Sequence, residues 1–313
     1  MESVRIGYGK DLVEYDPQQC FYVKLAPLKR MPLRPIDEAR MAAGEIYKKF
    51  GTAPTLCLSG GLDSECMAHA FLAEGIPFKA ATLIFTEDLN SHDSGHAISF
   101  CKEHHIPHEL VRLDIVKFFT SGDYLAYVKK YFCHTPELAA QLWFLDQISG
   151  PFVWAGEAFR IFPGNEIPAI RSISEFEAVF YRYVKLNKLA SVPNFHFFSS
   201  ELAWSFFKES LQKNYISFEE YDPEYYKGKL DFYRNAGFEL RELPERFRKL
   251  HGFEKVKIYF DEQLKNTNEN YRDRFRLPVS LDFPMAKDTY VDFLKTDVFA
   301  RKILGQLSET ASP

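Results

Sequence analysis

The sequence predicts an α/β protein with a parallel sheet in its N-terminal half and a mainly helical C-terminal half. Between Pro54 and residue 155, short apolar segments alternate with helical stretches. Strands that alternate with helices of about 10–15 residues are typical of right-handed βαβ units in a parallel sheet. Two of the apolar segments are followed closely by glycine, where a chain can turn sharply. Beyond Gly164 we expect helices and no further strands.

The chain of 313 residues divides into three regions. Residues 1–50 should contain short strands such as Cys20–Leu25, a linker with several prolines, and a leading helix over Ile36–Lys49. Residues 51–165 form the expected α/β domain. Residues 166–313 form the expected helical region on the substrate side.

Each expected element follows from its apolar spacing. The strands of the α/β domain are short and apolar: Thr55–Leu58, Lys79–Phe85, His108–Leu113 and Pro151–Ala155. Its helices place apolar residues on one face: Asp63–Glu74, Asp93–His104, Tyr124–Phe132 and Pro136–Ile148. The helices expected in the last region are Glu175–Asn187, Ser199–Lys213, Pro223–Ala236, Glu254–Asn266 and Thr289–Leu307.

The composition excludes several classes of protein. Hydrophobic residues make up 46% of the chain, which is enough for a sizeable core. The sequence has no apolar window of transmembrane length and no signal peptide, so we expect a cytoplasmic protein without membrane contact. The five cysteines form no C-x-x-C pair, which argues against a zinc site. The net charge of −4 does not favour nucleic acid as a partner.

The sharpest motif is Ser59-Gly60-Gly61-Leu62-Asp63-Ser64, between a predicted strand and a predicted helix. Its glycines let the backbone turn tightly and approach a ligand closely. The amide groups at the start of the following helix favour an anion, and the helix dipole adds to this effect. The hydroxyl groups of Ser59 and Ser64 are further donors. The motif therefore predicts a phosphate-binding loop.

Asp63 is unusual in such a loop because its carboxylate repels phosphate. The repulsion is removed if the carboxylate holds a divalent cation, and Mg²⁺ binds a few carboxylates together with phosphate oxygens. We therefore expect Asp63 to be a Mg²⁺ ligand. The alternative is an ordinary Gly-Gly turn, with Asp63 near a helix N-terminus, where a carboxylate is favourable by itself.

The loop resembles the PP-loop of the ATP pyrophosphatases, S-G-G-x-D-S, and no Gly-Lys-Ser/Thr of a Walker loop occurs in the sequence. The resemblance covers residues 54–165. It implies a doubly wound parallel sheet of the adenine nucleotide α-hydrolase (HUP) type, with ATP and Mg²⁺ as cofactors. Members of this superfamily cleave ATP between its α- and β-phosphates and adenylate an oxygen of the substrate. A nitrogen or sulfur nucleophile then displaces AMP.

A second segment, Val153-Trp154-Ala155-Gly156-Glu157, looks like the strand–Gly–Glu segment of the asparagine synthetase and β-lactam synthetase branch. That branch also contacts adenine through backbone groups at the end of the second strand, here Ile84 and Phe85. Glu157 would act as a general base or orient the acceptor. The residues that the resemblance assigns to nucleotide binding are Leu58, Ser59, Gly60, Gly61, Leu62, Asp63, Ser64, Ile84, Phe85 and Gly156.

The chain departs from that branch in two respects. Arg160 occupies the position of a metal-binding aspartate, so either Mg²⁺ has fewer protein ligands or the guanidinium neutralises pyrophosphate directly. The N-terminal region is too short for a glutaminase domain, and residue 2 is Glu instead of a cysteine nucleophile. Nitrogen would then come from free ammonia, from an amine of the substrate, or from a separate ammonia-supplying protein. The lysine that the branch places against the α-phosphate is assigned to Lys287, with Lys255 and Lys257 as rivals.

The resemblance implies an ATP-dependent ligase that forms AMP and pyrophosphate and activates a carboxylate or carbonyl oxygen of a small-molecule acceptor for attack by nitrogen. Its expected catalytic residues are Asp63, Glu157, Arg160 and Lys287. Two alternatives stay open. An enzyme that modifies a nucleobase or tRNA would be favoured by a basic patch at Arg241, Arg246, Arg248 and Lys249. A nucleotide-binding partner protein that has lost catalysis would explain Arg160.

Nearby histidines and aromatic residues have simpler explanations. His92 and His96 are spaced like metal ligands on a helix, but no third ligand is fixed near them, so we expect surface histidines. The aromatic run with Tyr225, Tyr226 and Tyr233 has the composition of a base-stacking surface. Its helical spacing instead favours a place in the core.

Overall fold

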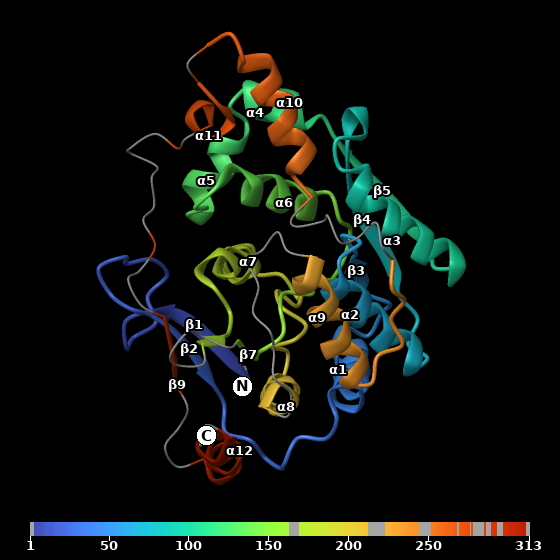
Figure 1. Cartoon of the computed structure of the whole chain (residues 1–313), viewed down its shortest axis with the longest axis vertical. Coiled ribbons are helices and arrows are strands. Elements are labelled where there is room, and N and C mark those ends of the chain that lie inside the picture. Colours follow the sequence, from blue (N-terminus) through green and yellow to red (C-terminus); the bar gives the residue numbers. More distant parts are fainter. Residues whose placement is uncertain are drawn as a thin grey trace.

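The chain contains a four-stranded parallel sheet, which lies toward the right of the view in Figure 1. The computed structural model describes residues 3–162, 169–211, 223–243, 252–267, 269–275, 277, 285, 289–292 and 297–310. The sheet consists of β3 (Thr55–Cys57), β4 (Lys79–Phe85), β5 (His108–Leu113) and β6 (Phe152–Val153). The α/β class and all four of these strands are confirmed.

The order of the strands in the sheet is β5-β4-β3-β6. From β3 the chain builds outward through β4 to β5 and then crosses back to add β6 on the other side of β3. The crossovers are α2 (Leu62–Ala73), α3 (Ser91–Glu103), and the series α4 (Ile115–Thr120), α5 (Tyr124–Tyr131) and α6 (Pro136–Asp146). The direction of winding therefore reverses between β3 and β6, and such a switch point opens a crevice at the carboxyl ends of the strands.

Each face of the sheet has its own apolar core because successive side chains of a strand point to opposite faces. Leu56 and Leu58 pack in one core cluster, whereas Cys57 packs in the other. The first cluster also contains residues of α1 (Pro35–Phe50), α8 (Ser200–Leu211) and α9 (Pro223–Asn235). The second also contains residues of α7 (Glu175–Leu186), α10 (Glu254–Leu264) and α11 (Tyr271–Arg274). The C-terminal helices thus complete both faces of the N-terminal sheet.

The expectation that strands end before Gly164 is wrong. Residues 289–292, expected to begin a helix, form strand β9 (Thr289–Asp292), and helix α12 begins only at Val298 (Val298–Thr310). Strand β9 pairs in parallel with β2 (Phe21–Leu25), which pairs antiparallel with β1 (Val4–Tyr8). Thr, Tyr and Val favour strands, but their partner lies far away along the chain. A hairpin of β7 (Arg160–Phe162) and β8 (Ala169–Arg171) was also not expected.

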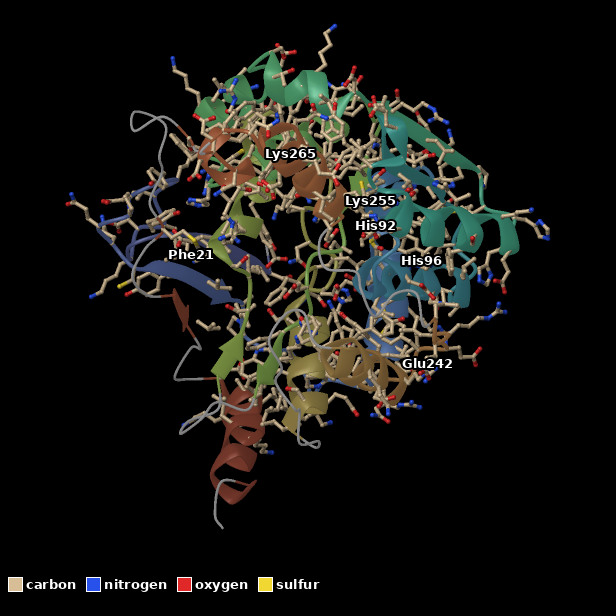
Figure 2. All side chains as sticks on the ribbon, turned by 45° about the horizontal axis from the view of Figure 1, so that its top comes forward. Phe21, His92, His96, Glu242, Lys255 and Lys265 are labelled. Atoms are coloured by element: carbon tan, nitrogen blue, oxygen red, sulfur yellow. The ribbon has the colours of Figure 1, made fainter. Side chains whose placement is uncertain are left out.

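Helix α10 is tied to the start of α3. His92 Nε2 lies 2.8 Å from Glu254 Oε2, and Lys255 Nζ donates a 2.9 Å hydrogen bond to Ser91 Oγ. Figure 2 shows His92 and Lys255 next to each other across this junction. His92 therefore joins two helices, and among the described residues no group of three or more potential ligands surrounds it as a metal site would require. None of the described helices combines the length and apolar character that crossing a bilayer requires.

The packing predicts which side chains support the fold. Phe207 on α8 is fully buried and stacks on Phe159, with ring centroids 4.4 Å apart. We expect Phe207→Ala to lower the free energy of unfolding by about 3–5 kcal/mol because it leaves a cavity in a packed core. Ile258 is 57% exposed, so Ile258→Ala is the control and should change it by less than about 0.5 kcal/mol. Urea unfolding followed by circular dichroism measures the free energy of unfolding of each variant. Equal losses in Phe207→Ala and Ile258→Ala would contradict the description of this core.

Candidate functional site

The motif Ser59–Ser64 connects β3 to the first turn of α2, as the sequence predicts. Gly60 has a φ of +91°, in the left-handed region that glycine adopts without strain. A Cβ at this position would lie 2.2 Å from the backbone oxygen of Asp93 on α3. The turn therefore depends on glycine at residue 60 for two separate reasons.

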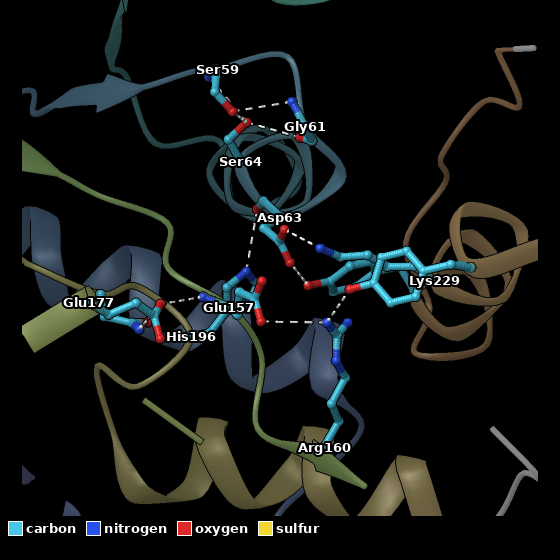
Figure 3. Close-up of polar contacts among 12 residues, drawn as sticks. Ser59, Gly61, Asp63, Ser64, Glu157, Arg160, Glu177, His196 and Lys229 are labelled. Carbon is cyan, nitrogen blue, oxygen red and sulfur yellow. Dashed lines mark hydrogen bonds and ion pairs between the residues drawn. The ribbon is translucent and has the colours of Figure 1, made fainter. Parts of the chain in front are cut away.

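Hydrogen bonds within the loop fix its shape (Figure 3). Ser64 Oγ donates to the backbone oxygen of Gly61 over 2.9 Å, and the backbone N–H of Gly61 donates to Ser59 Oγ over 3.3 Å. The two serine hydroxyls lie 3.4 Å apart. The serines thus brace the turn from within and keep its path close to the start of α2.

A cavity of about 490 Å³ opens at the carboxyl ends of β3, β4 and β6, at the switch point of the sheet. The other parts of the chain that line it are the end of β4, the start of α3, α6, the segment after β6, the first turns of α7, α9, and residues 252 and 253. Cavities of this size are typical of small-molecule sites. In α/β sheets the switch point is also where ligands usually bind.

Asp63 connects the loop to α9. Lys229 Nζ lies 2.5 Å from Asp63 Oδ2, and the hydroxyl of Tyr233 donates a hydrogen bond to Asp63 Oδ1. Lys229 and Tyr233 are one helical turn apart, so both side chains reach Asp63 from the same face of α9. Figure 3 shows the Lys229 ammonium pointing at the carboxylate.

The charges of this cluster stabilise one another. Burial alone would raise the pKa of Asp63, but the positive charges of Lys229 and Arg160 outweigh it and hold that pKa well below its ordinary value. Burial lowers the pKa of Lys229, and the charge of Asp63 more than restores it, so the net direction is upward. Burial and the same carboxylate raise the pKa of Tyr233 well above its ordinary value. At neutral pH the cluster is an ion pair with a neutral phenol.

His196 lies beneath the first turn of α2 and is completely buried. Its Nε2 donates to the backbone oxygen of Asp63 over 3.3 Å. It is held there because the backbone N–H groups of Phe195 and His196 bond to the segment that follows β6. Burial lowers the pKa of His196 to about 4, so the ring is neutral at physiological pH.

Arg160 lies behind the cavity. The structure places it in β7, fully buried, and it is not among the described residues that line the cavity. One guanidinium nitrogen lies 3.6 Å from Glu157 Oε2 and donates to the hydroxyl of Tyr225 over 3.2 Å. Glu157 and Tyr225 do line the cavity. Arg160 therefore contacts the site through these two side chains.

Glu177 holds the segment that carries Glu157. Its carboxylate accepts the backbone N–H of Glu157 over 3.0 Å and that of Ser174 over 3.1 Å, and it also accepts from Asn194 Nδ2 over 3.3 Å. Gly156 has a φ of +64°, and a Cβ there would lie 2.1 Å from Asn194 Nδ2. The resulting close fit fixes where Glu157 enters the cavity.

The remaining walls of the cavity are largely apolar. Trp154 stacks on Phe180 with ring centroids 4.3 Å apart, and Phe85 lies 5.0 Å from Phe253. Asn90 closes the end of β4: its Oδ1 accepts the backbone N–H of Phe85 and its Nδ2 donates to the backbone oxygen of Leu83, both over 2.8 Å. Apolar walls next to a polar loop suit a ligand with a flat ring and a charged chain.

The structure brings most of the predicted residues together. Ile84 is buried, neither Ile84 nor Gly60 is among the residues that line the cavity, and Lys287 is outside the described residues. Arg246, Arg248 and Lys249 of the proposed basic patch also lie outside them, whereas Arg241 pairs with Glu103. The predicted residues that do line the cavity are Leu58, Ser59, Gly61, Leu62, Asp63, Ser64, Phe85, Gly156 and Glu157.

Sequence reasoning missed the residues that complete the site. Lys229 and Tyr233 come from a helix far along the chain, and Glu177 from another. Tyr233 is in the core as predicted, with no exposed surface, but its hydroxyl also reaches Asp63. The i, i+4 spacing of a lysine and a tyrosine on one buried face was the available signal, because a lysine on such a face needs a partner.

The described residues do not form a metal site of their own. Both oxygens of Asp63 already accept from Lys229 and Tyr233. No group of three or more His, Cys, Asp or Glu side chains in the described part of the chain could hold a metal ion. The donor set therefore does not fit a Mg²⁺ ion that the protein binds through Asp63.

Comparison with models of known protein families gives no match, and comparison with curated proteins gives none either.

The requirement for glycine at residue 60 can be tested directly. We expect Gly60→Ala to lower the free energy of unfolding by at least about 1–3 kcal/mol, because the residue must adopt a left-handed φ and its Cβ meets Asp93. Gly95 on α3 has open space around it, so Gly95→Ala should be neutral or stabilising by up to about 1 kcal/mol. Thermal unfolding compares the two variants, and an equally stable Gly60→Ala protein would contradict the described turn.

His196 predicts a specific dependence of stability on pH. Between pH 6.5 and 4 the unfolded chain binds a proton that the buried ring does not, so stability falls as the pH is lowered through this window. We expect wild type to lose about 2–3 kcal/mol more than His196→Gln between about pH 7 and about pH 4.5. Urea unfolding at both pH values measures the difference. Parallel pH curves would show that His196 titrates normally.

Proposed function

We propose that this chain is an ATP-dependent ligase of the PP-loop type, with a fold of the adenine nucleotide α-hydrolase kind, that releases AMP and pyrophosphate. The observation that carries the proposal is the position of the loop Ser59–Ser64. It follows the strand β3, opens the helix α2 and faces the cavity at the switch point of the sheet. Amides at a helix N-terminus beside such a crevice are suited to a phosphate chain.

The parts of the cavity match the parts of ATP. The phosphates would lie against the amides of Gly61 to Ser64, and the adenosine against Leu58, Phe85 and Gly156. Mg²⁺ would enter as the chelate of the phosphate chain. Catalysis of this kind depends mainly on positioning and on neutralising charge.

Glu157 would face the acceptor, whose carboxylate or carbonyl oxygen becomes adenylated. A nitrogen nucleophile then attacks the activated carbon, and AMP leaves. Glu157 is suited to accept a proton from that nucleophile because its carboxylate lines the cavity. The nitrogen would come from ammonia, from an amine of the substrate, or from a separate ammonia-supplying protein.

One observation favours a second candidate, a nucleotide-binding partner protein without catalysis. Arg160 replaces the metal-binding aspartate that the resemblance implies, and its guanidinium is buried among Glu157 and Tyr225. Such a protein would bind ATP without turning it over. The products of a reaction with ATP separate the two candidates.

The ligase predicts which bond of ATP breaks. With α-labelled ATP, Mg²⁺ and a pool of carboxylic acids and amines, we expect AMP and pyrophosphate to accumulate. Glu157→Gln should lower this rate by about 10²-fold or more because the general base is lost. Glu109 is a suitable control because it is exposed on β5, so Glu109→Gln should react like wild type. Chromatography of the labelled nucleotide gives the answer: ADP in place of AMP would overturn the ligase, and binding without turnover would favour the partner protein.

A further inference from the structure

The carboxylate of Asp63 lies where a metal ligand is expected, but Lys229 and Tyr233 contact it. We infer that Asp63 binds no divalent ion and instead holds Lys229 over the phosphate-binding loop, where Lys229 is the protein cation that meets the phosphate chain. That the phosphate chain belongs to a nucleotide rests on the function proposed above. The contact between Asp63 and Lys229 is independent of that proposal (Figure 3).

Both oxygens of the carboxylate are already used. Lys229 Nζ is 2.5 Å from Oδ2, and the Tyr233 hydroxyl donates to Oδ1. Mg²⁺ requires oxygen ligands at about 2.0–2.1 Å in a nearly regular octahedron. An ion at that distance from Oδ2 would lie next to the ammonium of Lys229, and the two cations would repel each other.

Lys229 is also the one basic side chain among the described residues that line the cavity. The neighbouring carboxylates have partners of their own: Glu157 lies near Arg160, and Glu177 accepts the backbone N–H groups of Glu157 and Ser174. Among the described residues, Lys229 is therefore the basic side chain that a phosphate group on the loop would meet.

The position of Lys229 suits this role. Its side chain is 12% exposed, so it is held by the protein but still reaches the cavity. An ammonium has three N–H donors, and the bond to Asp63 uses one. A phosphate at the start of α2 would thus meet backbone amides and an ammonium together.

This arrangement explains the acidic residue inside the loop. A carboxylate there repels phosphate unless a cation neutralises it, and Lys229 is that cation. Arg160 adds positive charge from behind without lining the cavity. The divalent ion is then needed only by the nucleotide.

The test measures metal binding and nucleotide binding separately. Mn²⁺ is titrated into the wild-type protein alone and followed by electron paramagnetic resonance, and we expect no bound ion. The non-hydrolysable analogue α,β-methylene-ATP is then titrated calorimetrically at several Mg²⁺ concentrations. Lys229→Met should weaken its binding by about tenfold to hundredfold, the value of a lost charged hydrogen bond. Lys227 is exposed on the same helix, so Lys227→Met should bind like wild type.

The role of Asp63 is read from the Mg²⁺ dependence. Asp63→Asn should weaken the analogue less than Lys229→Met does and leave the Mg²⁺ concentration for half-maximal binding unchanged. Asp231→Asn, at an exposed carboxylate of α9 that does not line the cavity, is the matched control and should bind the analogue like wild type. Bound Mn²⁺ in wild type that Asp63→Asn abolishes, or a raised Mg²⁺ requirement in Asp63→Asn, would overturn the inference.

Two further outcomes are informative. Asp63→Asn leaves a buried ammonium without its carboxylate, and if this variant does not fold, the double variant Asp63→Asn/Lys229→Met replaces it. That double variant should match Lys229→Met in affinity and Mg²⁺ dependence, and a higher Mg²⁺ requirement would overturn the inference. Failure of wild type to bind the analogue at any Mg²⁺ concentration would overturn the proposed function and the phosphate role of Lys229. The Mn²⁺ titration would still decide whether Asp63 binds metal.

Discussion

The ion pair of Asp63 and Lys229 is the interaction on which the organisation of the site depends. It joins the first turn of α2, in the N-terminal half, to α9, in the C-terminal half. Removing one partner of a buried pair is far more costly than the pair itself is stabilising, because the other charge is left without compensation. The pair therefore specifies where α9 docks, and with it which side chains close the cavity.

The sheet supplies the frame for this contact. Because β3 lies between β4 and β6, the loop that leaves β3 faces a crevice bordered by both neighbours. The C-terminal helices cover both faces of the sheet and contribute to the same two core clusters as the strands. The regions assigned separately from the sequence thus share their cores, and the site lies where they meet.

Charged groups of the site are arranged in matched sets. Lys229 neutralises Asp63, Arg160 lies beside Glu157, and Glu177 accepts backbone N–H groups. A low-dielectric cavity makes each unmatched charge expensive, so this arrangement keeps the site stable while leaving polar groups exposed to a ligand. The ring of His196 is likewise neutral because its burial makes the charged form costly.

The parallel sheet, nearly all of the helices of the chain, and the loop Ser59–Ser64 could be predicted from the sequence. These features follow from local periodicity, glycine and the order of strand, loop and helix, which need no knowledge of distant contacts. The strand Thr289–Asp292 could not be predicted from local sequence, because its partner β2 lies at the other end of the chain. The pairing of Asp63 with Lys229 could not be predicted for the same reason, because these residues are 166 positions apart. A carboxylate can bind a metal ion or an ammonium, and it is the docking of α9 that brings the ammonium of Lys229 against Asp63.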